Sequence, residues 1–102
     1  MKKVLSVLAL TTLTSSMAFA ASDYTLNVES NNNQAKVTVL KDGQAVSNVP
    51  VKVVGNGTKT YVSGSKGTFV AANLFDNGRT FTFELVDDNG EVVREQRYLT
   101  SF

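Results

Sequence analysis

Apolar and polar residues alternate along most of the chain, which is the pattern of β-strands that bury one face. The clearest case is the segment 80–86, in which Phe81, Phe83 and Leu85 fall on one face and threonine and glutamate on the other. We expect the three apolar side chains to be core residues. Similar strand patterns occur at 24–29, 36–40, 48–54, 58–62, 68–72 and 91–99.

Glycine, asparagine and aspartate residues separate these segments. Asp42-Gly43 and Asn89-Gly90 are dipeptides that supply the positive φ angles of tight turns. The only proline, Pro50, is expected on an edge strand or at a strand start, because it donates no ladder hydrogen bond. No segment beyond residue 20 has a helical period. The pattern therefore predicts one all-β domain, an antiparallel Greek-key sandwich of about seven strands.

The first twenty residues have the composition of a signal peptide. Two lysines follow the first methionine, an apolar run occupies 4–10, and the small residues Ala18 and Ala20 suit the signal peptidase. We expect cleavage after Ala20, which removes 1–20 and leaves 21–102 as a β-sandwich domain in the periplasm or outside the cell. The apolar run is far shorter than the roughly 20 residues of a spanning helix. Because the chain also lacks a cysteine for a lipid anchor, we expect no membrane insertion.

The charge of the chain argues against nucleic-acid binding. Two of the ten basic residues leave with the predicted signal peptide, so eight remain against nine acidic residues, a formal net charge of −1 instead of +1. Both signs are mixed along the chain, whereas nucleic-acid binding needs a basic surface. We expect no nucleic-acid partner.

The chain contains no histidine and no cysteine. The usual serine and cysteine triads and the common zinc and copper ligands are thereby excluded. The 87–91 segment does not have the spacing of a calcium loop, and its Asn-Gly pair favours a tight hairpin turn. A hydrolase based on carboxylates alone would need two acidic side chains in one cleft, and no spacing selects a pair. We expect no metal, no cofactor and no enzymatic activity.

Two stretches resemble the transthyretin-like modules that include the carboxypeptidase regulatory-like domain. Residues 42–53 are similar to their glycine, small-residue turn and valine strand, and residues 61–69 to their threonine-rich strand, polar turn, glycine and aromatic residue. The immunoglobulin-like repeats of bacterial surface proteins share nearly the same spacing. Both resemblances imply a seven-stranded Greek-key sandwich. The hydroxyisourate hydrolases of this group rely on histidines and a C-terminal Tyr-Arg-Gly-Ser motif, and this chain has neither.

A binding surface is the best functional expectation, because sandwich folds carry many unrelated activities. Tyr61, Phe75, Arg79 and Tyr98 are residue types enriched at contact hot spots, and they are the candidate binding residues. A free sheet edge is a second way to bind, either at the strand with Val51 and Val53 or at the C-terminal strand. We expect a non-enzymatic module that recognises a protein or a polymer of the envelope or extracellular space. The alternative is a small inhibitor or accessory subunit of a secreted enzyme.

Overall fold

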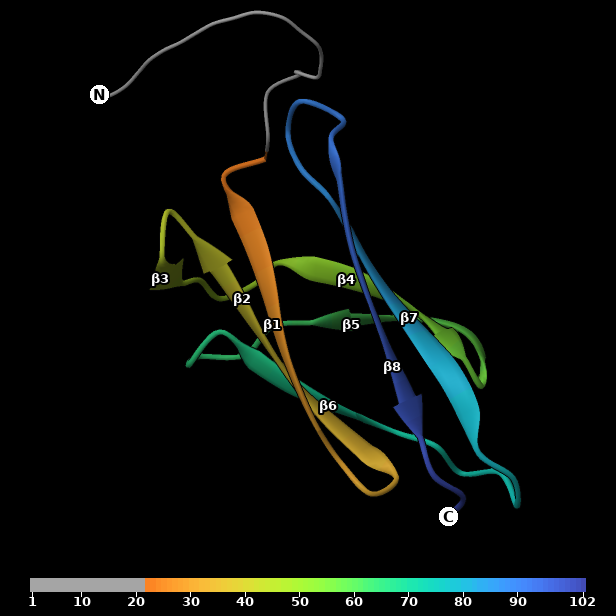
Figure 1. Ribbon diagram of the computed structural model, residues 1–102. Coiled ribbons are helices and arrows are strands. Elements are labelled where there is room, and N and C mark those ends of the chain that lie inside the picture. Colours follow the sequence, from red (N-terminus) through yellow and green to blue (C-terminus); the bar gives the residue numbers. More distant parts are fainter. Residues whose placement is uncertain (1–21) are drawn as a thin grey trace, which may run out of the picture.

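The described part of the chain is built from antiparallel strands joined by short turns. The computed structural model describes residues 22–102 (Figure 1). The predicted signal peptide, residues 1–20, lies outside the described residues. The strands are β1 (Tyr24–Asn31), β2 (Gln34–Lys41), β3 (Gln44–Ala45), β4 (Pro50–Gly55), β5 (Gly57–Val62), β6 (Thr68–Ala72), β7 (Arg79–Val86) and β8 (Val92–Leu99).

The strands form two four-stranded sheets packed as two layers (Figure 1). In the first sheet β1 pairs with the whole length of β2, so β6 and the two-residue β3 share the other edge of β2. The second sheet has the order β5-β4-β7-β8. The predicted all-β sandwich is confirmed, and β3 brings the number of strands to eight. Across residues 22–102 no helix is long and apolar enough to cross a membrane.

The core lies between the two sheets and contains the predicted face of β7. Phe81, Phe83 and Leu85 are each no more than 1% exposed, so the predicted facing of this strand is confirmed. Burial of such a side chain contributes roughly 1.5–3 kcal/mol to stability. The other buried apolar residues are Leu26, Val28, Ala35, Val37, Val39, Val51, Val53, Phe69, Ala71 and Leu99.

The turn at Asp42-Gly43 follows the dipeptide that predicts it, whereas in the Asn89-Gly90 pair only the glycine has a positive φ. Asp42 and Gly43 have φ angles of 53° and 82° and form the two-residue turn between β2 and β3. In the loop between β7 and β8, Gly90 has a φ of 82° and its N–H donates to the carbonyl of Asp87. Local turn chemistry thus sets both connections.

The position of β4 corrects one prediction. Pro50 is the first residue of β4, as the sequence predicts, but β4 lies between β5 and β7 and is not an edge. Its pairing with β7 begins at Lys52, so the missing N–H of Pro50 breaks no bond of that ladder. The expectation of a free edge at Val51 and Val53 is therefore wrong. The C-terminal strand β8 does end the second sheet.

Candidate functional site

The strands β5 and β6, labelled in Figure 1, are edge strands of the two different sheets. A groove opens between them. We call it the edge groove, and its volume is about 340 Å³. It is lined by Val53, Asn56, Lys59, Tyr61, Val70, Ala72, Leu74 and Phe81. The lining combines an apolar surface with a few polar groups, which is typical of ligand sites in proteins.

Contacts between the two sheets hold both ends of the edge groove. At one end the ring of Tyr61 stacks on the ring of Phe69, with 5.0 Å between the centroids and 16° between the planes. At the other end the Asn56 side chain donates from Nδ2 to the carbonyl of Ala72 over 2.7 Å. The groove is therefore a preformed feature of the sandwich, and Tyr61 is one of the four predicted binding residues.

Lys59 is the only charged residue in the lining of the edge groove. Its position on β5 gives it the same facing as Tyr61, and its Nζ lies 5.1 Å from the centroid of the Tyr61 ring. A cation over an aromatic face is held there by the ring quadrupole. The groove thus presents one positive charge beside an aromatic wall, with no acidic residue among the lining residues.

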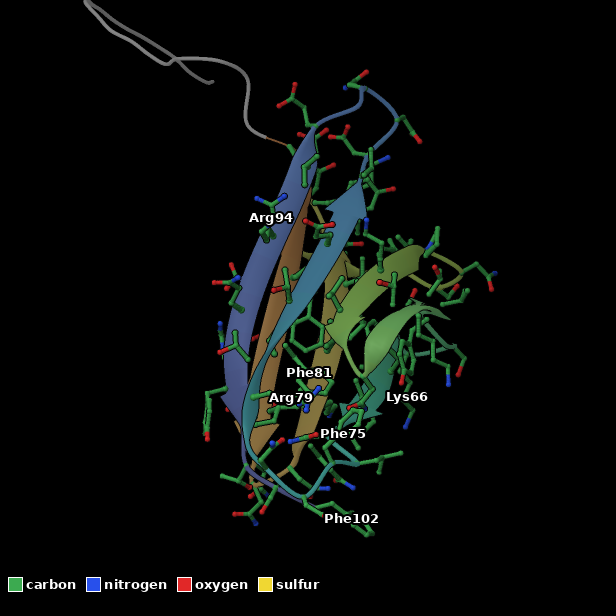
Figure 2. The ribbon with its side chains drawn as sticks, turned by 90° about the vertical axis from the view of Figure 1, so that its right-hand side faces the viewer. Lys66, Phe75, Arg79, Phe81, Arg94 and Phe102 are labelled. Carbon is green, nitrogen blue, oxygen red and sulfur yellow. The ribbon has the colours of Figure 1, made fainter. Side chains whose placement is uncertain are left out.

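The mouth of the groove carries exposed apolar residues from the 73–78 loop. Leu74 is 65% exposed and lines the groove, and the neighbouring Phe75 is 42% exposed. The Arg79 guanidinium lies 3.8 Å from the centroid of the Phe75 ring, and the two side chains appear together near one end of the molecule in Figure 2. Phe75 and Arg79, both predicted binding residues, are therefore brought together.

Arg79 also connects the loop to the second sheet. It donates from Nη1 to the carbonyl of Gly55 and from Nη2 to Oδ1 of Asn77, each over 3.1 Å. Its Nε is buried without a hydrogen-bond partner among the described residues. The cation–π attraction between the guanidinium and the Phe75 ring partly offsets the cost of burying this group. Arg79 thus helps to position the groove mouth.

A buried residue that the sequence analysis does not single out, Asn73, holds the same loop. Asn73 is fully buried, and its Nδ2 donates to the carbonyls of Asn77 over 2.8 Å and Thr100 over 3.0 Å. Its Oδ1 accepts the N–H of Phe75 over 3.1 Å. The alternation of β6 could have predicted that Asn73 is buried, because Asn73 continues the series of inward residues Phe69 and Ala71. A buried amide in that series is retained only when its hydrogen bonds are satisfied.

Tyr98 lies outside the edge groove, beside Leu99, the strand partner of Arg79. It is opposite Thr80 on the outer face of the second sheet and is 63% exposed. Its hydroxyl occupies the space that a side chain at Gly78 would need. Tyr98 therefore does not contribute to the edge groove, in which Tyr61 faces the interior of the sandwich.

Two acidic residues of the second sheet and its β7–β8 loop, Glu84 and Asp87, make contacts away from the edge groove. Glu84 lies between Arg94 and Lys52, with N–O distances of 2.6 Å and 3.4 Å, and the hydrogen bond from Arg94 holds the pKa of Glu84 below its usual value. Asp87 accepts the hydroxyl of Ser22 over 2.7 Å, and this bond is the main reason why the pKa of Asp87 is lowered. Arg94, the partner of Glu84, lies toward the other end of the molecule from Phe75 at the groove mouth in Figure 2.

The described residues contain no group of three or more side chains suited to hold a metal ion. The lining of the edge groove includes no carboxylate, so it does not contain the acidic pair that a carboxylate hydrolase needs.

Comparison with protein-family models, with curated proteins and with solved structures gave no match. The resemblance to transthyretin-like or immunoglobulin-like modules stays a prediction.

Proposed function

We propose that this protein is an exported, non-enzymatic binding module that recognises a partner protein or an envelope or extracellular polymer through the edge groove and its mouth. The observation that carries this proposal is the open groove of about 340 Å³ between β5 and β6. A preformed apolar cavity with few polar groups is the ordinary form of a binding site.

The residues around the groove support contact as its role. Tyr61 forms one wall, and Leu74 and Phe75 extend the apolar surface outward from the cavity. Arg79 stacks on Phe75, which keeps that ring in place before any partner arrives. Aromatic and arginine anchors in preorganised positions lose little side-chain entropy on binding.

The proposed location depends on the amino-terminal sequence. The apolar run and the small residues Ala18 and Ala20 support export and cleavage. The domain has no cysteine, so its fold does not depend on an oxidising compartment.

The test is to immobilise the purified protein, expose it to envelope and culture-supernatant extracts, and identify what it retains. Leu74→Glu places a charge at the exposed groove mouth and should abolish specific retention without unfolding the domain. Val86→Glu is the matched control, because Val86 is 64% exposed at the end of β7, outside the groove lining. Equal retention by the parent and by Leu74→Glu would contradict binding through the groove.

A further inference from the structure

The backbone of β5 has hydrogen-bonding groups that face away from its only neighbour. One residue beyond the antiparallel ladder of β5 with β4, the N–H of Ser63 donates to the carbonyl of Val49. In an antiparallel pair, every second residue of a strand directs its N–H and C=O groups toward the neighbouring strand. Counted from Ser63, these residues are Tyr61 and Lys59, whose backbone groups therefore point toward β4. The N–H and C=O groups of Thr58, Thr60 and Val62 consequently point to the free edge of the sheet.

The other strands at sheet edges have local protection. β1 lies against β8, and the N–H of Thr100 donates to the carbonyl of Asn32. On β8 the paired charges of Glu95 and Arg97 lie on the inward face, opposite Phe83 and Phe81. Inward charges of this kind prevent an edge from pairing with another strand.

Some backbone groups on the free edge of β6 already have hydrogen-bond partners. The carbonyl of Thr68 accepts the N–H of Gly64, and the carbonyl of Ala72 accepts the Asn56 side chain. None of the loop or side-chain hydrogen bonds within residues 22–102 reaches the backbone of Thr58 or Thr60. The edge of β5 is thus the one best prepared to pair with an added strand.

We propose that the edge of β5 binds an extended peptide segment as an added antiparallel strand, with two of its side chains directed into the edge groove. This inference rests on the proposed function and specifies the class of partner. Backbone pairing gives affinity in such complexes, and alternate side chains in pockets give specificity. The unpaired backbone groups of Thr58 and Thr60 select an extended chain, because a helix has already used its own N–H and C=O groups.

The groove also specifies the side chains of the peptide. In an antiparallel pair centred on Thr60, the peptide residues opposite Tyr61 and Lys59 face the groove, and they lie two positions apart. An apolar side chain opposite Tyr61 extends the stack with Phe69, and an acidic side chain opposite Lys59 complements the only charge in the lining. The preferred segment therefore reads apolar, any residue, acidic.

Charge complementarity favours a foreign segment over a second copy of this chain. The β5 sequence, Gly-Thr-Lys-Thr-Tyr-Val, contains no acidic residue to place opposite Lys59. Pairing of β5 with β5 of another copy would leave both lysines without a carboxylate partner. The occupant is therefore an acidic extended segment of another protein.

The test uses a fluorescein-labelled peptide with the core Thr-Val-Thr-Glu-Thr and protein expressed from the full chain, with binding followed by fluorescence anisotropy. Thr60→Pro removes the free-edge N–H while keeping every bond to β4, and should weaken binding by about tenfold or more. N-methylation of the central threonine of the peptide should have the same effect. Thr60→Ala, which retains the backbone N–H, is the control.

The role of the Lys59 charge is tested by reversing its sign. Lys59→Glu should weaken binding of the glutamate peptide by about tenfold, and a peptide with lysine in place of glutamate should restore it. Lys41→Glu is the matched control, because Lys41 also lies over a tyrosine ring, that of Tyr24, but in the other sheet and outside the groove lining. Thermal melting of each variant separates loss of binding from loss of fold.

Each outcome decides between the two proposals. Binding that depends on Leu74 but tolerates Thr60→Pro and N-methylation would overturn strand addition and leave groove binding intact. No binding of the peptide at about 1 mM would also overturn strand addition, since that limit is weaker than specific recognition. A dimer without peptide in sedimentation velocity that Thr60→Pro abolishes would identify a second copy as the occupant.

Discussion

Replacement of Asn73 by alanine tests whether this buried side chain holds the groove mouth and the C-terminal segment together. The substitution removes two donated hydrogen bonds of 2.8 Å and 3.0 Å and one accepted bond of 3.1 Å. A typical hydrogen bond contributes about 0.5–1.5 kcal/mol net, so the three predict a loss of roughly 2–4 kcal/mol. This is a large fraction of the stability of a small domain, which is about 5–15 kcal/mol.

The assay is urea unfolding followed by circular dichroism, with the thermal midpoint as a second measurement. A loss of that size lowers the midpoint by roughly 10–25 °C in a domain of this length. Asn56→Ala is the control, because the Asn56 amide also donates to a backbone carbonyl but is exposed and makes one such bond, so it should cost about 1 kcal/mol or less. Equal midpoints for Asn73→Ala and Asn56→Ala would refute the role of Asn73.

Asn73→Asp isolates the donor function of the amide. It keeps the acceptor for the N–H of Phe75 but places an oxygen against the carbonyls of Asn77 and Thr100. Burial and these carbonyls raise the pKa of the introduced acid, so its protonated form is the one that the fold accommodates. The variant should be less stable than the parent at neutral pH and recover part of the difference as the pH falls, because the protonated carboxyl group donates a hydrogen bond.

Three further substitutions test other parts of the structure. Phe83→Asp should abolish the cooperative melt, because it buries an unpaired charge at a fully buried position, and a melt like that of the parent would mean that the facing of β7 is wrong. The pKa of Glu84 is lowered in the folded protein, mainly by the hydrogen bond from Arg94. The ionised carboxylate of Glu84 therefore stabilises the fold fully at pH values above the ordinary pKa of 4.5, and this contribution is lost as the pH falls below that value. Midpoints of Glu84→Gln should consequently change less than those of the parent on acidification below this value, and identical acid profiles would contradict the prediction. Gly55→Ala directs its Cβ into the buried ring of Phe81 and should cost about 1–3 kcal/mol in urea unfolding, whereas unchanged stability would show that the ring has room to move.

The sequence alone predicted every strand except the two-residue β3, and it predicted the facing of β7. The alternation in residues 80–86 predicts a strand with Phe81 and Phe83 inward, and both are buried. The Asp42-Gly43 pair predicts the turn that the structure contains. These features are readable because they are local: the two-residue period of a strand and the φ preferences of turn residues involve only neighbours along the chain.

The tertiary structure decided which strands are neighbours and which side chains meet. Alternation gives a strand a buried face but not a partner, so it did not reveal that β4 is interior and that β5 is the edge. It also did not separate Tyr98, on the outer face of the second sheet, from Tyr61 in the edge groove. The groove itself lies between β5 and β6, which are consecutive in the chain but belong to different sheets, so it depends on the pairing of β5 with β4 and of β6 with β2.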